Sequence, residues 1–477
     1  MASFHVENFG CRATQADGAA IEREFQERGL VPAGASSRAE IVVINSCTVT
    51  ASADQDARAA IRRVRRENPH CQIVVTGCYA QRAPQEVASL PGVNRVIGNS
   101  HKHQLAEIVA ASLLNAASFE PHTGFVSLSS LISDVQTQVF VSDIFAHTEL
   151  LAAPVFDHTG PRASHNRTRP NLKVQDGCDN RCSFCVIPYV RGQSRSLPLS
   201  QILNEVNALI DSGYREIVIS GINLGRWGRE LPQTGNWEPA TDNRSSSRPP
   251  AQGLHFEDLV RAILSRTSLE KLRISSVEPM DWSDDLIDLM AKSPRIAKHA
   301  HVPLQSGSDR VLRAMHRKYR PWHYREKLEK LRAAMPTAAI GADVMVGFPG
   351  ETEADFEQTR LLIEELPFTY LHVFTYSARP GTPAAAMRNQ VPVQIARARN
   401  RILRDLAAEK KLAFMRSFVG KTVEAITLDV SDGKSTEALT DNYLKLRLGG
   451  QHEPNRWVRA QVEQVEDGAL MAVSVAA

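Results

Sequence analysis

The stretch NLKVQDGCDNRCSFC, residues 171–185, joins a strand-like run to three cysteines placed within eight residues. Cys178, Cys182 and Cys185 follow the spacing C-x3-C-x2-C, among Gly, Asp, Asn and Arg, which are not the usual neighbours of a buried apolar cysteine. Structural zinc commonly uses two C-x2-C pairs, or one pair with two histidines, and no such fourth ligand stands nearby. Three thiolates suit a [4Fe–4S] cluster with one open iron, which can bind a small molecule through an amine and a carboxylate.

The run before these cysteines is the first of six strand-like runs within residues 164–410. The six are Leu172–Val174, Glu216–Ser220, Lys271–Ser275, His299–Pro303, Gly341–Val346 and Tyr370–Thr375. Helical segments alternate with them, which predicts a partial (β/α)6 barrel or a highly curved parallel sheet. Chemistry in such a barrel gathers at the carboxyl ends of the strands. A segment rich in Pro, Gly, Ser and Asn, residues 226–253, predicts a mobile insertion.

Residues 1–112 also alternate strands and helices, which predicts a doubly wound α/β domain. Cys11, Cys47 and Cys78 each stand just past a predicted strand, where ligands collect in open α/β sheets. One such cysteine alone is often only a small buried hydrophobic residue. Three at equivalent places favour a second cluster, again with an open iron. Cys71 has no equivalent position, and we expect it to pack in the core.

The rest of the chain divides into a connector of unknown structure, residues 113–163, and a C-terminal domain, residues 411–477. Short alternating runs with Gly turns in the latter predict a small antiparallel β-barrel. The sequence contains neither a secretory signal nor roughly 18 consecutive apolar residues, so we expect a cytoplasmic protein with no membrane span. The net charge of +3 is uninformative about nucleic acid.

The cysteines and several local sequence motifs resemble those of the radical S-adenosylmethionine (SAM) methylthiotransferases. The motifs are NSCTVT, VTGCYAQ, QDGC, SGINLG and HVPLQSGSD. The resemblance covers nearly the whole chain. It is strongest to the branch that converts N6-threonylcarbamoyladenosine (t6A), at position 37 beside the tRNA anticodon, to its 2-methylthio derivative. It implies two [4Fe–4S] clusters, one on each cysteine trio, and a C-terminal TRAM domain that binds RNA.

The same resemblance implies how the reaction proceeds. One SAM molecule supplies a methyl group to sulfur held at the first trio, and a second, cleaved at Cys178, Cys182 and Cys185, supplies a radical that removes hydrogen from the adenine. Cofactors carry this chemistry, so no acid–base residue is nominated. The expected partners are the tRNA anticodon loop and an electron donor such as flavodoxin or ferredoxin, and we expect a monomer.

Residues near the predicted strand ends are candidates for binding SAM, although turns, caps or internal pairing would also explain them. These are Ser220, Gly221, Ser276, Glu278, Gln305, Ser306 and Asp343. Basic residues around the cysteine loop are candidates for contacting RNA phosphates, with an ordinary solvated segment as the alternative. These are Arg162, Arg167, Arg169, Lys173, Arg191 and Arg195. The C-terminal domain is slightly acidic, so its RNA-binding role rests on resemblance.

Three other functions remain open from sequence. One is the sibling enzyme that acts on isopentenyladenosine in tRNA. Another is the sibling that modifies a ribosomal-protein aspartate, because Asp179 stands where the tRNA branch more often has Asn. The last is a non-catalytic iron–sulfur or zinc protein that binds RNA.

Overall fold

The computed structural model describes residues 2–117, 137–147, 168–231 and 253–475. The chain divides into two compact units. The first consists of Met1–Val155, Asp176–Asn180 and Cys185–Arg195, and the second of Phe156–Gln175, Arg181–Phe184 and Ser196–Ala477. The cysteine loop therefore contributes to both units. Most of the predicted insertion at 226–253 lies outside the described residues, as does the predicted domain boundary near residue 163.

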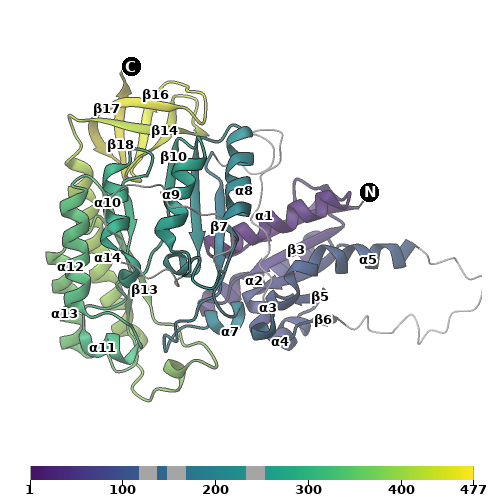
Figure 1. Ribbon diagram of the computed structural model, residues 1–477. Coiled ribbons are helices and arrows are strands. Elements are labelled where there is room, and N and C mark those ends of the chain that lie inside the picture. Colours follow the sequence, from purple (N-terminus) through teal and green to yellow (C-terminus); the bar gives the residue numbers. More distant parts are fainter. Residues whose placement is uncertain (1, 118–136, 148–167, 232–252, 476–477) are drawn as a thin grey trace, which may run out of the picture. The chain divides into compact units, whose positions relative to one another are not determined.

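A six-stranded parallel sheet, with the order β2-β1-β3-β4-β5-β6, forms the centre of the first unit (Figure 1). Its strands are β1 (Ser3–Asn8), β2 (Val31–Pro32), β3 (Ile41–Ser46), β4 (Gln72–Gly77), β5 (Val93–Gly98) and β6 (Gln138–Phe140). This order is that of a doubly wound sheet, as predicted. The sixth strand comes from the segment predicted only as a connector, and it pairs with β5 between Arg95 and Gln138.

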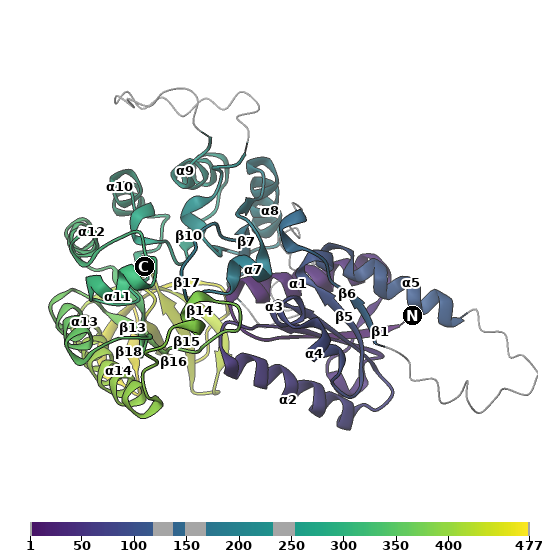
Figure 2. The ribbon, with the colours of Figure 1, turned by 90° about the horizontal axis from the view of Figure 1, so that it is seen from below.

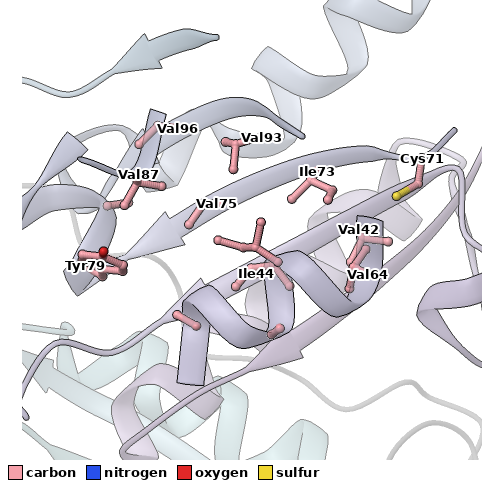
Figure 3. Packing of buried hydrophobic residues seen from close by; sticks show 14 of the residues in the cluster. Val42, Ile44, Val64, Cys71, Ile73, Val75, Tyr79, Val87, Val93 and Val96 are labelled. Atoms are coloured by element: carbon pink, nitrogen blue, oxygen red, sulfur yellow. The ribbon is translucent and has the colours of Figure 1, made fainter. Parts of the chain in front are cut away.

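Helices cover both faces of this sheet. They are α1 (Arg12–Glu27), α2 (Ala51–Glu67), α3 (Cys78–Arg82), α4 (Pro84–Ala88) and α5 (Leu105–Ala117), and α7 (Ile187–Arg191) belongs to the same unit. Figure 2 shows α1 and α5 on one side of the sheet and α2 on the other. Ile21 of α1 packs with Val43 of β3 on one face, and Val64 of α2 packs with Ile44 on the other. Cys71 lies in this second core, as expected (Figure 3).

All six predicted strands of the barrel are present in parallel pairs. They are β7 (Asn171–Asp176), β9 (Glu216–Gly221), β10 (Lys271–Ile274), β11 (His299–His301), β12 (Ala339–Val346) and β13 (Tyr370–Thr375), with a short β8 (Arg195–Ser196) beside β7. They form two sheets, β10-β9-β7-β8 and β11-β12-β13. A parallel bridge between Ser276 and His301 joins β10 to β11, so the strands follow one another around a partial barrel.

The outer layer of this barrel is helical. It comprises α8 (Leu199–Asp211), α9 (Phe256–Arg266), α10 (Asp284–Lys292), α11 (Asp309–Ala314), α12 (Pro321–Ala334), α13 (Glu353–Glu365) and α14 (Val393–Arg416). Ser283, Ser308 and Thr352 cap three of these helices by accepting hydrogen bonds from backbone N–H groups of the first turn. In the described residues, no helix is both long and apolar enough to cross a membrane.

A closed five-stranded barrel, drawn in yellow in Figure 1, completes the second unit. Its strands are β14 (Thr422–Ser431), β15 (Ser435–Thr440), β16 (Lys445–Gly449), β17 (Trp457–Glu466) and β18 (Ala469–Ser474). The predicted small β-barrel is confirmed, and its strand pairs are antiparallel except for β16 and β18, which run parallel. An odd number of strands cannot close with every neighbour antiparallel, so one parallel pair is required.

Candidate iron–sulfur and SAM site

The strand order of the first unit brings the ends of β1, β3 and β4 side by side. In the ladder, Asn8 of β1 stands beside Asn45 of β3, and Ser46 of β3 stands beside Gly77 of β4. Cys47 and Cys78 are the next residues after these ladder positions, and Cys11 follows shortly after β1. The topology therefore gathers the three cysteines at one edge of the sheet, where ligands collect in such folds.

Two glycines allow the close approach of these chain segments. A Cβ at Gly10, which has φ +106°, would lie 2.4 Å from Cβ and 2.8 Å from Sγ of Cys47. A Cβ at Gly77, which has φ +97°, would lie 2.3 Å from the carbonyl oxygen of Ser46. Any other residue would push the backbone beside Cys11 or Cys78 away from the strand that carries Cys47.

The three thiols influence one another electrostatically. Burial, together with the neighbouring Cys78 and Cys11 sulfurs, raises the pKa of the Cys47 thiol to about 12. Asn99 Nδ2 lies 3.6 Å from Cys78 Sγ. Within the described residues, no three His, Cys, Asp or Glu side chains converge tightly enough for a single metal ion. Three neighbouring thiols at one edge of the sheet would suit a four-iron cluster with one open iron, and Cys11, Cys47 and Cys78 would hold it.

A buried network of charges adjoins this trio. Arg191 donates to Asp176 at 2.9 Å and to Asp17 at 3.0 Å, and Lys102 Nζ lies 2.9 Å from Asp17. Cys78 and Cys11 also act on the guanidinium of Arg191 electrostatically. Two cations and two carboxylates balance one another, which makes their burial tolerable. The network escaped prediction because Arg191 and Asp17 are 174 residues apart in the sequence.

In the first unit, the cysteine loop is fixed by glycines and by contact with the trio. Cys178 N donates to the carbonyl oxygen of Gly192 at 3.1 Å. A Cβ at Gly177, which has φ +73°, would lie 1.8 Å from the carbonyl oxygen of Gln193. Val186, the residue after Cys185, packs against Cys78. The residue that follows the C-x3-C-x2-C motif, Val186, therefore contacts Cys78 of the first trio, and both belong to the first unit.

Cys182 belongs to the second unit, where it meets a side chain that the sequence did not suggest. Arg317 Nη1 lies 3.3 Å from Cys182 Sγ, and Arg317 Nη2 forms an ion pair with Glu278. Glu278, a predicted SAM ligand, is therefore linked to a predicted cluster ligand through one guanidinium. Helix α11 ends at Ala314, and the residues that follow it form this contact.

Ser220 and Gly221 lie at the carboxyl end of β9, as predicted. The Ser220 hydroxyl is buried and, among the described residues, makes no hydrogen bond. A Cβ at Gly221 would lie 2.9 Å from the Gln175 side-chain oxygen, so glycine is required by a close approach. The Ser220 hydroxyl is suited to receive a polar group of a ligand.

The remaining SAM candidates are held by internal contacts. Ser276 Oγ lies 3.0 Å from His301 Nδ1, and the other ring nitrogen of His301 lies 3.5 Å from Asp343. Gln305 adopts a left-handed conformation with φ +62°. Ser306 is buried, with its hydroxyl 3.3 Å from that of Thr359, which gives it a local structural role.

The structure places the RNA candidates less favourably. Arg162 and Arg167 lie outside the described residues. Lys173 and Arg191 are buried, so neither presents its charge to a phosphate. Arg169 is half-buried and pairs with Glu216 at 3.5 Å, and the guanidinium of Arg195 donates to two backbone carbonyl oxygens. The basic residues of this segment predicted an exposed surface that binds RNA. In the structure, most of the basic residues that are described are instead buried or paired within the protein.

We expect Gly10→Ala to reduce the iron content of the cluster predicted at the first trio. The added Cβ would overlap Cys47, and the positive φ adds backbone strain of about 1–3 kcal/mol. The measurement is iron per chain after anaerobic reconstitution. Gly34→Ala is the matched control, because nothing lies within 4 Å of its Cβ position. Equal iron contents in the two variants would contradict the convergence of the trio.

Comparison with known proteins gives matches along the chain. Residues 172–363 match the radical SAM superfamily, and residues 3–98 match the uncharacterized protein family UPF0004. The threonylcarbamoyladenosine tRNA methylthiotransferase MtaB of Aquifex aeolicus is 33% identical over 456 residues, which cover 96% of this chain and 99% of the relative. That of Bacillus subtilis is 32% identical over 458 residues, covering 95% and 92%.

Two further similarities widen the comparison. The tRNA-2-methylthio-N(6)-dimethylallyladenosine synthase of Novosphingobium aromaticivorans is 33% identical over 426 residues, covering 89% of this chain and 86% of the relative. The solved structure of the radical SAM methyltransferase TsrM from Kitasatospora setae aligns with a TM-score of 0.55 at 15% identity, covering 81% of this chain and 77% of TsrM. The second similarity concerns the fold alone.

A partial parallel barrel whose first strand leads into C-x3-C-x2-C defines a radical SAM protein, and this fold implies a [4Fe–4S] cluster and SAM. The relatives narrow the assignment because they match almost from end to end. The chain belongs to the tRNA methylthiotransferase family of radical SAM enzymes.

Proposed function

We propose that the chain converts t6A at position 37 of tRNA to 2-methylthio-t6A. The main supporting observation is the contact of Cys78 with Val186. Cys78 is a predicted ligand of one cluster, and Val186 directly follows Cys185, a predicted ligand of the other. Sulfur insertion at an adenine C–H requires both a sulfur carrier and a radical source, and this contact within the first unit supports a chain that carries both. The relatives named for t6A are matched over 85–99% of their length.

We propose that Cys11, Cys47 and Cys78 hold a second [4Fe–4S] cluster. When bound, the two clusters supply the sulfur attachment site and the electron that cleaves SAM. The chain's own residues hold the thiolates in place: Gly10 and Gly77 permit their approach, and Asn99 donates toward Cys78. The burial of Cys47 and Cys78 keeps water from that side of the site.

The partners follow from this proposal. The tRNA anticodon loop is the substrate, and a low-potential donor such as flavodoxin or ferredoxin supplies electrons to a monomer in the cytoplasm. In the sequence, Asp179 favours the related enzyme that modifies a ribosomal-protein aspartate. Its carboxylate accepts a hydrogen bond from the backbone N–H of Ser194 at 3.1 Å, so its presence is explained by the local loop without any reference to substrate.

The alternative substrate is N6-dimethylallyladenosine in tRNA. Relatives named for it are 32–34% identical and are matched over 83–86% of their length, whereas three of the four t6A relatives are matched over 92–99%. The two substrates differ in charge, because threonylcarbamoyl carries a carboxylate and dimethylallyl is apolar.

Deletion of the gene should remove 2-methylthio-t6A from bulk tRNA and leave t6A in its place. The measurement is mass spectrometry of tRNA nucleosides, with the plasmid-borne gene restoring the product. The control is the 2-methylthio derivative of N6-dimethylallyladenosine in the same digest, which should not change. Persistence of 2-methylthio-t6A would refute the substrate, and loss of the dimethylallyl product instead would establish the alternative.

A further inference from the structure

The last residue of α11 and the turn that follows it, residues 314–317, hold the middle of the cysteine loop in the second unit. The hydroxyl of Ser183 donates to the carbonyl oxygen of Ala314 at 2.7 Å, and its backbone N–H donates to that of Met315 at 3.1 Å. His316 Nδ1 lies 3.2 Å from the carbonyl oxygen of Arg181. These contacts flank Cys182 on both sides, so the loop and the turn form one local structure.

The turn also directs a cation at Cys182. His316 has φ +58°, a left-handed conformation that reverses the chain immediately before Arg317. The guanidinium of Arg317 is buried, with Nη1 3.3 Å from Cys182 Sγ and its centre 4.9 Å from the ring centroid of Tyr319. Glu278 holds the other end of the guanidinium. The position of the charge is therefore fixed from three directions.

We propose that Arg317 is a positioning residue that raises the reduction potential of the cluster bound through Cys182, and that Glu278 moderates the effect. The proposal rests on the function proposed above, which requires that cluster to accept an electron. Hydrogen bonds to the sulfurs and the net charge nearby set the potential of iron–sulfur clusters. Reduction adds one negative charge, so a buried cation stabilises the reduced state, and burial strengthens the effect.

The test is an EPR-monitored redox titration of the anaerobically reconstituted full chain, following the signal that Cys178→Ala removes. Arg317→Gln should shift the reduction equilibrium at least tenfold toward the oxidised cluster, a fall of about 59 mV for one electron. Arg317→Lys should shift it less, because the charge remains. Glu278→Gln should shift it in the opposite direction, because the cation loses its counter-charge.

Opposite shifts distinguish an electrostatic role from simple loosening of the loop, which would move both variants the same way. Arg295→Gln is the control, since its guanidinium bonds to backbone carbonyl oxygens of the same unit, on Leu264, Thr267 and Leu269. If Arg317→Gln fails to bind iron, the reduction potentials of Arg317→Lys and Glu278→Gln still test the proposal. Unchanged potentials, or shifts in one direction for both sites, would overturn the proposal. The titration contains no tRNA, so a wrong substrate would leave its result intact.

Discussion

Cys178→Ala should abolish both SAM cleavage and methylthiolation, whereas Cys47→Ala should abolish methylthiolation and leave SAM cleavage detectable. Each variant removes one of the three ligands that we propose for a different cluster. The loss should exceed the roughly 10–100-fold cost of removing a group that only supports a metal ligand. Cys47 lies in the first unit at the end of β3, and alanine there leaves the sheet ladder intact.

Two measurements separate these outcomes. Chromatography of 5′-deoxyadenosine, with dithionite as reductant, reports SAM cleavage, and nucleoside mass spectrometry reports methylthiolation. Iron should fall from about eight to about four per chain in either variant. Cys71→Ala is the matched control and should retain both activities, because Cys71 is buried in the hydrophobic core just before β4, whereas Cys78 follows the other end of that strand. A Cys47→Ala protein that still methylthiolates its substrate would refute the second cluster.

The parts of the site that could be predicted from sequence share a physical basis. C-x3-C-x2-C is a local spacing, so its chemistry is visible without any fold. Cys11, Cys47 and Cys78 are distant in sequence, yet parallel strands place their carboxyl ends along one edge of the sheet. Recognising the alternation of strands and helices was therefore enough to predict that the three cysteines lie close together. Glycines at 10 and 77 could have strengthened this prediction, because a glycine directly before a cysteine at a strand end indicates a close backbone approach.

The parts that could not be predicted depend on which side chains meet across the fold. Arg191 and Lys173 are charged, and charge in a sequence predicts exposure unless a buried partner is known. Their burial follows from tertiary contacts such as the Arg191 pairing with Asp17. Arg317 meets Cys182 across 135 residues, which no periodicity reveals. The strand β6 is only three residues long, too short for alternation to be recognised.

Arg273→Met should destabilise the second unit by about 3–5 kcal/mol, the usual cost of removing one partner from a buried ion pair. Arg273 Nε lies 2.6 Å from Glu216 Oε1, and both side chains are almost completely buried. Burial acts to raise the pKa of Glu216, but Arg273 and Arg169 outweigh it and keep the pKa low, so the carboxylate is ionised. Methionine would leave that charge with only the more distant Arg169.

Arg273 also joins the two barrels of the second unit. Its Nη1 and Nη2 donate to the carbonyl oxygens of Asp441 and Thr440 at 3.1 and 3.3 Å, and its guanidinium lies 5.1 Å from the ring centroid of Tyr443. Loss of these bonds leaves two carbonyl acceptors without this donor. We therefore expect the variant to expose the C-terminal barrel to proteolysis before the rest of the chain unfolds, because its attachment to the strands of the larger barrel is weakened.

Thermal unfolding of the full chain, with limited proteolysis, measures this effect. A loss of this size should lower the unfolding midpoint by on the order of 10 °C. Arg215→Met is the matched control, since Arg215 pairs with Glu270 at 3.4 Å near the same strand ends but on the surface, and such pairs contribute about 1 kcal/mol or less. Arg273→Met combined with Glu216→Leu should recover part of the loss, because no unpaired carboxylate remains. If Arg273→Met and Arg215→Met unfold at the same temperature, the buried pair does not hold the two barrels together.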